Sequence, residues 1–232
     1  MRGITVMIDS ASRPNLLKQT LPTVLKHLKY SGEIVWVFHE AVLDENKSNE
    51  CLALIKDYGM IRGKIVQISP TGEGMSIGSI LRTVRTDFFI HWEDDFIALR
   101  EIDLNLMTKI MQRCPDVNQI IFNRRDTMPD VSGWKKREVI RFGEYLTTSP
   151  HWRYTPALWR TDFIKPKWQD FPGNNSHWQM NAFLKKGTLD SPEMKSAEWV
   201  IQNLGTYYFG PIDEKAYCRH IGAGHSGRVE GA

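Results

Sequence analysis

The stretch His91-Trp92-Glu93-Asp94-Asp95-Phe96 places three consecutive carboxylates directly after an apolar run. The preceding residues 86–90 (Thr-Asp-Phe-Phe-Ile) have the β-branched and aromatic content of a short buried strand. Three adjacent acids repel one another and destabilise a fold that buries them without compensation. A divalent cation compensates them, and oxygen ligands suit Mg²⁺ or Mn²⁺. Because ligands bind at the carboxyl ends of strands in open α/β sheets, the stretch predicts a cation-assisted diphosphate site, with a solvated acidic turn as the alternative.

Strand and helix patterns alternate through the first half of the chain. The expected strands cover 3–9, 33–38, 64–68, 86–90 and 119–123, and the expected helices lie near 16–28, 46–58, 80–84 and 102–112. This alternation is typical of a parallel sheet whose strands are joined by right-handed helical crossovers.

The second half of the chain has a different character. After Arg124 the periodicity weakens, and six of the eight tryptophans occur at positions 134, 152, 159, 168, 178 and 199. No flexible linker separates the halves, so we expect one domain over 1–232 in which 124–232 shares the sheet of 1–123. The glycine-rich tail from His220 to Arg228 is expected to be mobile unless a ligand orders it.

Composition indicates an ordinary folded protein. The 232 residues are 41% hydrophobic and 25% charged, which is typical of globular chains. No apolar stretch is long enough to span a bilayer, and the chain enters a strand pattern at once, which leaves no room for a signal peptide. The three cysteines form no CxxC pair, so we expect reduced thiols in a cytoplasmic protein.

Charge is unevenly distributed along the chain. The net charge is only +3, but the segment 124–167 holds ten Lys/Arg against five Asp/Glu. A basic middle segment attached to a mildly acidic remainder suggests that one face meets an anionic partner.

The order of these features resembles the GT-A glycosyltransferases, most closely the family 2 type that uses nucleotide sugars. The resemblance rests on Ser10-Ala11-Ser12-Arg13-Pro14 after the first strand, the second strand ending at Glu40, the triplet Glu93-Asp94-Asp95, and His220-Ile221-Gly222. It runs over nearly the whole chain. It implies an α/β fold with a mostly parallel sheet flanked by helices, a nucleotide-sugar-binding half over 1–123 and an elaborated acceptor-binding half over 124–232.

The resemblance gives the acidic triplet the place of the DxD motif. Asp95 would hold the metal, while Glu93 or Asp94 would reach the ribose or a metal-bound water. A cation that bridges both phosphates stabilises the leaving diphosphate. His220 would complete the metal shell or bind the diphosphate, and imidazole favours Mn²⁺ over Mg²⁺. Arg228 on the same tail would clamp phosphate.

The same resemblance places nucleotide-binding residues at the ends of the first two strands. Glu40 would accept a hydrogen bond from uracil N3–H, which favours a UDP donor, although an exposed strand-end acid is the alternative. Ser10 and Arg13 would frame the other side of the base and the phosphates.

An inverting transfer also needs a general base that takes the proton of the acceptor hydroxyl. Glu198, in the first turn of a predicted helix, is the leading candidate, because a helix N-terminus favours the charged carboxylate. Glu193 and Asp190 are its rivals.

The acceptor is expected to meet the basic, tryptophan-rich half. Rings and cations interleave at 134–137, 152–154 and 159–160, a pattern that suits a phosphate-bearing acceptor unless the tryptophans belong to the core. The predicted function is a metal-dependent, inverting transfer of a hexose from a UDP-sugar to a hydroxyl of a glycan or of a hydroxymethylated base in DNA. The alternatives are a nucleotidyltransferase, although the loop 9–14 has no glycine, and a non-enzymatic nucleic-acid-binding or lectin-like module.

Overall fold

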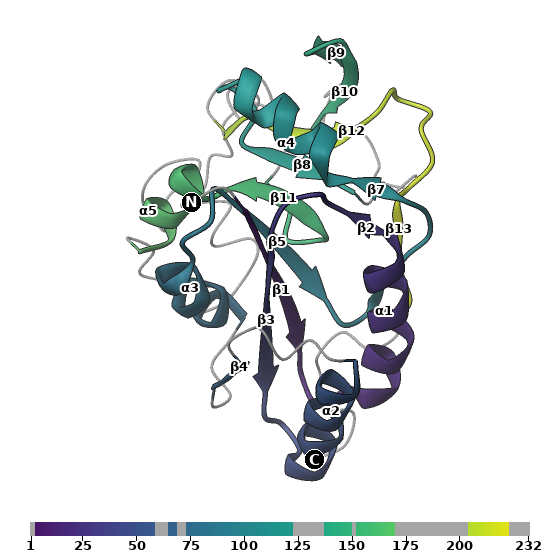
Figure 1. The fold of residues 1–232 in the computed structure, drawn as a ribbon, viewed down its shortest axis with the longest axis vertical. Helices are drawn as coiled ribbons and strands as arrows, with labels where there is room; N and C mark the ends of the chain where they lie inside the picture. The colour runs from purple at the N-terminus through teal and green to yellow at the C-terminus, as the bar shows by residue number, and fades with distance from the viewer. Residues whose placement is uncertain are drawn as a thin grey trace, which may run out of the picture.

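A nine-stranded mixed sheet forms the centre of the molecule (Figure 1). The computed structural model describes residues 3–58, 65–68, 73–122, 137–149, 152–169 and 204–222. The strand order across the sheet is β4-β3-β1-β5-β11-β8-β12-β10-β9. Strands from both sides of residue 123 therefore share one sheet.

Four parallel strands make up the first half of this sheet. They are β4 (Ile65–Ile68), β3 (Ile34–Ala41), β1 (Ile4–Ser10) and β5 (Phe88–Glu93). The register pairs Asp9 of β1 with both His39 of β3 and Glu93 of β5. The predicted parallel α/β core is confirmed, and β5 extends past the expected end at 90, so Glu93 still belongs to the strand.

The second half of the sheet is mixed. β11 (Ala157–Arg160) runs antiparallel to both β5 and β8 (Gln119–Ile121), and β12 (Thr206–Phe209) is parallel to β8. The hairpin of β9 (Glu138–Arg141) and β10 (Glu144–Thr148) completes the edge. The antiparallel strand β11 thus lies between the parallel strands of the first half and the strands β8, β12, β10 and β9.

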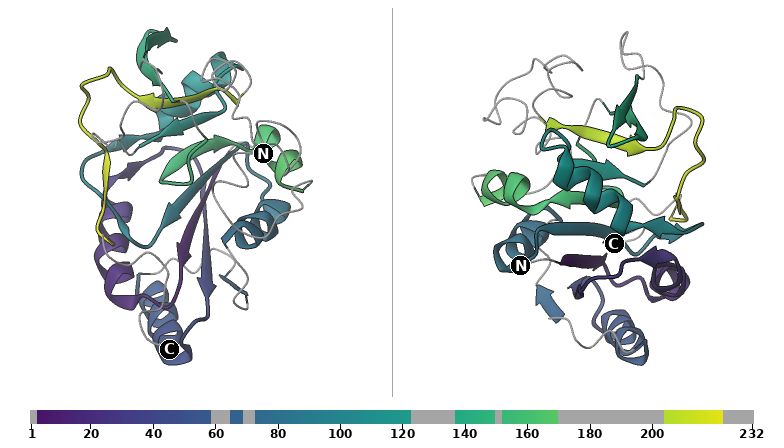
Figure 2. Two further views of the ribbon diagram at one scale, coloured as in Figure 1. Left: turned by 180° about the vertical axis from the view of Figure 1, so that it is seen from behind. Right: turned by 45° about the horizontal axis from the view of Figure 1, so that its top comes forward.

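Helices cover both faces of the sheet (Figures 1 and 2). α1 (Pro14–His27) buries Leu17 and Leu21 in the same cluster as Val6 and Ile8 of β1. Met7 points to the opposite face, because side chains alternate along a strand. There it joins the cluster of α3 (Glu73–Thr83) and α5 (Thr161–Gln169). The remaining helices are α2 (Glu45–Asp57), capped by Asp44, and α4 (Leu104–Arg113), capped by Asp103.

Two short strand pairs lie outside the central sheet. β2 (Leu28–Lys29) pairs with β7 (Ile102–Asp103), which is why α4 begins at Leu104 rather than at the predicted residue 102. β13 (Cys218–His220) pairs antiparallel with β6 (Phe96–Ala98), with His220 opposite Phe96. The second pair brings the last described strand beside the acidic triplet.

The described tryptophans of the second half belong to the core, so they do not stack on an acceptor as the sequence pattern suggested. Trp152 and Trp159 are fully buried and meet edge to face, with ring centroids 5.4 Å apart. Trp159 also stacks on Trp168 of α5 at 5.9 Å. Arg160 donates hydrogen bonds to the carbonyls of Met111, Cys114 and Val117. Trp134, Trp178 and Trp199 lie outside the described residues.

The cysteines are all free, as predicted. None of the helices within the described ranges has the length and hydropathy of a membrane span.

The turn before β12 depends on a glycine. Gly205 has φ +58°, and its carbonyl accepts from the N–H groups of Asn118 and Gln119. A Cβ there would lie 1.9 Å from the carbonyl oxygen of Asp116. We expect Gly205→Ala to lower the free energy of unfolding by more than about 2 kcal/mol in urea denaturation, because the backbone must move.

The matched control is Gly143→Ala. Gly143 also has a positive φ, +81°, but a Cβ added to it would have no heavy atom within 4 Å. Backbone strain alone should lower the free energy of unfolding of Gly143→Ala by about 1 kcal/mol. Equal losses for the two variants would show that the contact with Asp116 is unimportant.

Candidate active site

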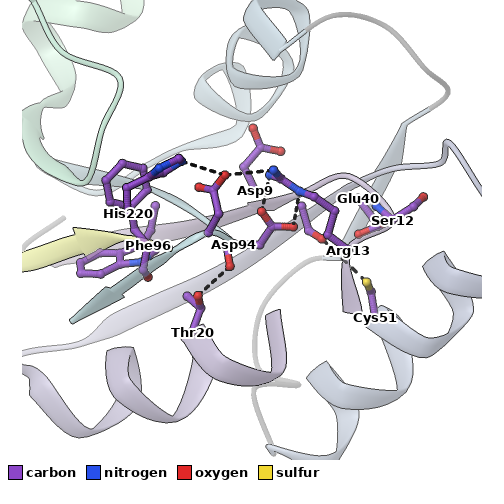
Figure 3. A network of polar contacts seen from close by, with 12 residues as sticks. Asp9, Ser12, Arg13, Thr20, Glu40, Cys51, Asp94, Phe96 and His220 are labelled. Carbon is purple, nitrogen blue, oxygen red and sulfur yellow. Dashed lines mark hydrogen bonds and ion pairs between the residues drawn. The ribbon is translucent and has the colours of Figure 1, made fainter. Parts of the chain in front are cut away.

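The acidic triplet straddles the end of β5 and the turn into β6. The N–H of Asp94 donates to the carbonyl of Asp9 at 2.8 Å, and the hydroxyl of Thr20 in α1 donates to the carbonyl of Asp94 at 2.6 Å (Figure 3). The backbone of the turn is therefore attached to both β1 and α1. This places Asp94 and Asp95 at the carboxyl ends of the parallel strands, where the sequence predicted a site.

Both carboxylates of this turn contact Arg13 (Figure 3). The guanidinium donates through Nε to Asp94 Oδ2 at 3.2 Å, through Nη2 to Asp94 Oδ1, and through Nη1 to Asp95 Oδ2 at 2.9 Å. Asp94 is 0% exposed and Asp95 is 6% exposed. The alternative of a solvated acidic turn is therefore wrong, and an arginine supplies compensation that the sequence analysis assigned to a metal ion alone.

Burial sets the electrostatics of this ion pair. Desolvation raises the pKa of Asp94 to about 7, against the opposing effects of Arg13 and of a hydrogen bond from Ser10. Burial alone would lower the pKa of Arg13, but the charges of Asp94 and Asp95 raise it. The charge of the Asp94 carboxylate therefore depends on the guanidinium beside it.

His220 reaches the same turn from β13. Its Nε2 lies 3.2 Å from Asp95 Oδ2, and its ring packs against Phe96 with centroids 4.9 Å apart. The N–H of Ile221 donates to the carbonyl of Asp95 at 2.7 Å. Gly222 follows so closely that a Cβ there would meet Asp95 Oδ2 at 2.7 Å. The C-terminal residues named by the resemblance are thus packed on Asp95.

The geometry of Asp95 and His220 fits a divalent cation in part. Asp95 Oδ1 is buried and has no hydrogen-bond partner in the described part of the chain. Within those residues, no group of three or more His, Cys, Asp or Glu side chains is arranged to hold a metal. The protein would therefore supply an oxygen and an imidazole nitrogen, and the other ligands would come from a bound donor and water.

Glu40 is buried at the end of β3 and is not the exposed acid of the alternative interpretation. Its Oε1 accepts from the N–H of Ser12 at 2.7 Å and from the hydroxyl of Ser48 at 2.8 Å. The hydroxyl of Ser12 in turn accepts from the N–H of Leu43 and Asp44. Glu40 thereby connects the loop after β1 with the start of α2. Its Oε2 is buried and has no partner among the described residues.

Ser10 lies between Glu40 and the acidic turn, on the face covered by α1 and α2. Its hydroxyl is 3.8 Å from the sulfur of Cys51 and is also within reach of the Asp94 carboxylate, so its single proton can be donated to either of them. Burial, and then the charge of Glu40, raise the pKa of Cys51 to about 12. The thiol is therefore a packing group and not a nucleophile.

A second polar cluster lies on the opposite face of the same strands. Asp9 Oδ1 is 2.5 Å from His39 Nδ1, and Asp9 Oδ2 is 3.6 Å from His91 Nε2. Burial alone would raise the pKa of Asp9, but the two histidines lower it to about 2. Sequence reasoning missed this cluster, although Asp9 is the last residue of one predicted strand and His39 and His91 each directly follow another.

Glu93, the first residue of the acidic triplet, is half-buried at the end of β5, and its charge acts on Arg13 and helps to raise the pKa of that guanidinium. Glu198 and Arg228, with the rival bases Glu193 and Asp190, lie outside the described residues.

The Asp9 cluster predicts a pH-dependent contribution to stability. A carboxylate whose pKa falls from 3.8 to about 2 on folding stabilises the folded protein above about pH 4, and the effect is lost as pH falls towards 2. Asp9→Asn should lower the free energy of unfolding at pH 7 by on the order of 2 kcal/mol, measured in urea.

The difference between wild type and Asp9→Asn should shrink between pH 4 and pH 2, while the exposed control Asp57→Asn shows none. A difference that stays constant over this range would contradict the electrostatic explanation.

Comparison with known proteins identifies the fold. No family model matches the chain, and no curated protein matches it by sequence. The structure is similar to the mannosyltransferase PcManGT from Pyrobaculum calidifontis in complex with GDP-Man and Mn²⁺ (TM-score 0.54, 10% identity, 92% of this chain and 55% of that chain). It is also similar to S. aureus TarS 1–349 in complex with UDP-GlcNAc (TM-score 0.56, 15% identity, 94% of this chain and 58% of that chain).

These similarities concern the fold. The structure is also similar to the complex of TarS 1–349 with UDP (TM-score 0.55, 12% identity, 94% of this chain and 60% of that chain). The chain spans 55% to 60% of the length of these three structures. The resemblance predicted from the sequence is confirmed at this level, and the chain has the GT-A type of fold found in nucleotide-sugar glycosyltransferases.

Proposed function

We propose that this protein is a metal-dependent glycosyltransferase that moves a hexose from a UDP-sugar to a hydroxyl acceptor with inversion. The observation that carries the proposal is the meeting of Asp95 and His220 at the carboxyl ends of the parallel strands. A carboxylate and an imidazole from distant parts of the chain converge there, and one carboxylate oxygen has no protein partner in the described structure. That arrangement suits a cation that is shared with a ligand.

The proteins of similar fold support the choice of donor. PcManGT was solved with GDP-Man and Mn²⁺, and TarS with UDP-GlcNAc and with UDP. We favour UDP for this chain because Glu40 retains a carboxylate oxygen without a partner in the described residues. Such an oxygen would accept a hydrogen bond from uracil N3–H.

Each residue of the site has a role in this proposal. Asp95 and His220 would hold Mn²⁺ or Mg²⁺, which when bound stabilises the negative charge of the departing diphosphate. Arg13 would contact the phosphates, Ser10 and Glu40 the nucleotide, and Glu93 the ribose. Asp94 changes role, because in this structure its carboxylate is buried and engaged by Arg13. It therefore positions the guanidinium rather than touching the ribose.

The second half would supply the acceptor site and the general base. We retain Glu198 as the base, on its place in the first turn of a predicted helix, and Arg228 as a phosphate clamp, on the resemblance. A glycan and a hydroxymethylated base in DNA remain the two acceptor classes. Because the described tryptophans of the second half are buried, they do not support stacking on DNA bases. The excess of basic residues in 124–167 is then the remaining support for a DNA acceptor. Retention of duplex DNA that falls steeply with salt would support the DNA acceptor.

A donor-hydrolysis screen tests the function. The protein is incubated with UDP-, GDP- and dTDP-sugars in the presence of Mn²⁺, Mg²⁺ or chelator, and released nucleotide is measured. We expect slow hydrolysis of a UDP-sugar only with a cation, and a loss of about 100-fold in Asp95→Asn, because a cation ligand is removed.

The exposed control Asp57→Asn should hydrolyse the donor at the wild-type rate. Calorimetry with UDP, with and without Mn²⁺, completes the test. Full activity of Asp95→Asn, or no UDP binding under either condition, would refute the proposal.

The role of Glu40 has its own test. Glu40→Gln keeps the Oε1 acceptor for Ser12 and Ser48, so the free energy of unfolding should fall by less than about 1 kcal/mol. With Oε1 held by Ser12 and Ser48, the new amide NH2 takes the place of Oε2 and would present a donor to uracil N3–H, which is itself a donor. UDP affinity, measured by calorimetry, should therefore weaken by about tenfold. Unchanged affinity, matching the exposed control Glu33→Gln, would exclude Glu40 from the base site.

A further inference from the structure

We infer that Arg13 competes with the metal ion for Asp95 in the donor-free protein and thereby makes cation binding depend on the donor diphosphate. The inference rests on the proposed function and adds a rule for the order in which ligands occupy the site. It begins from the contacts of a single carboxylate oxygen. Asp95 Oδ2 lies 2.9 Å from Arg13 Nη1 and 3.2 Å from His220 Nε2, the two groups on either side of it.

The position of the guanidinium places its positive charge next to any cation that binds Asp95. Arg13 is attached to the turn by two hydrogen bonds to Asp94 in addition to the one to Asp95. A cation on Asp95 would therefore sit beside a fixed positive charge, and like charges at contact distance repel strongly in a partly buried site. Cation binding in the absence of other ligands must either displace Nη1 from Asp95 or tolerate this repulsion.

A diphosphate removes the conflict. The negative charge of the diphosphate attracts the cation and the guanidinium at the same time. The planar guanidinium can also donate two parallel hydrogen bonds to phosphate oxygens. The Arg13 side chain is 28% exposed, so part of it faces the side from which a ligand arrives. Asp94 is 0% exposed on its side chain and would retain the guanidinium at the turn while Nη1 changes partner.

The expected behaviour is a thermodynamic coupling. Mn²⁺ alone should bind weakly, UDP should strengthen Mn²⁺ binding, and by reciprocity Mn²⁺ should strengthen UDP binding by the same factor. Removing the guanidinium should abolish the competition and the part of the coupling that comes from it, while the part that comes from direct ligation of the cation by the diphosphate remains. If Arg13 had only a structural role, replacing it would change the stability of the protein and leave the Mn²⁺ affinity of the folded protein unchanged.

The experiment measures free Mn²⁺ by electron paramagnetic resonance in titrations with and without UDP. For wild type we expect UDP to tighten Mn²⁺ binding by about tenfold or more. For Arg13→Gln we expect Mn²⁺ alone to bind about tenfold tighter than in wild type, and UDP to add a correspondingly smaller factor than it adds in wild type. Arg13→Lys should keep the weak binding of Mn²⁺ alone, since it keeps the charge, and lose much of the UDP effect, since it lacks the fork.

Two controls separate the inference from a loss of folding. Arg141 forms a comparable ion pair with Asp116, and the Arg141 side chain is 31% exposed. The variant Arg141→Gln removes this ion pair and should leave both titrations unchanged. Because Arg13→Gln leaves the buried Asp94 carboxylate unpaired, the double variant Arg13→Gln/Asp94→Asn is titrated as well. It should bind Mn²⁺ alone as tightly as Arg13→Gln. Melting curves confirm that each titrated variant is folded.

The outcomes distinguish this inference from the proposed function. Wild-type Mn²⁺ affinity in both Arg13→Gln and the double variant would overturn the competition. A UDP effect on Mn²⁺ binding that is as large in Arg13→Gln as in wild type would overturn the role of Arg13 in the coupling. If UDP binds to no variant, the coupling and the proposed function both fall, and the titration with Mn²⁺ alone still decides the competition at Asp95.

Discussion

The buried ion pair between Arg13 and Asp94 is the interaction on which the site depends. Asp94 is buried where β5 ends, and burial alone would drive its carboxyl to the neutral form. The guanidinium of Arg13, delivered by the loop after β1, allows the charged form to exist there. The same guanidinium donates to Asp95, so the residue that stabilises the turn also contacts the candidate metal ligand.

Two polar clusters lie at the ends of these strands, one on each face of the sheet. Alternation along β1 sends Ser10 to the α1 and α2 face and Asp9 to the α3 and α5 face. On the first face lie Ser10, Glu40 and Asp94, and Glu40 connects the loop after β1 with the start of α2. On the second, Asp9 joins His39 and His91 inside the fold. One parallel register thus produces both clusters, because it aligns the last residues of three adjacent strands.

The parallel half and its helices could be predicted from the sequence because their signals are local. The apolar spacing of α1 and the alternating or continuous apolar runs of β1, β3 and β5 need no knowledge of distant residues. The insertion of β11 between β5 and β8, and the return of β12, follow from pairings between distant segments that no local pattern encodes. The same limit applies to the site. Repulsion within Glu93-Asp94-Asp95 predicts a positive partner, but only the fold shows that Arg13 is one.

The pairing of β13 with β6 has a consequence for biosynthesis. The parallel strands and the acidic turn are complete once the ribosome has passed Ala98, whereas His220 is among the last described residues to be made. A nascent chain that has not yet reached Cys218 already carries Asp95 and Arg13, but it lacks the imidazole and the backbone of Ile221 that pack on the turn. A chain truncated before Cys218 therefore has the acidic turn but lacks the contacts that His220 and Ile221 make with Asp95.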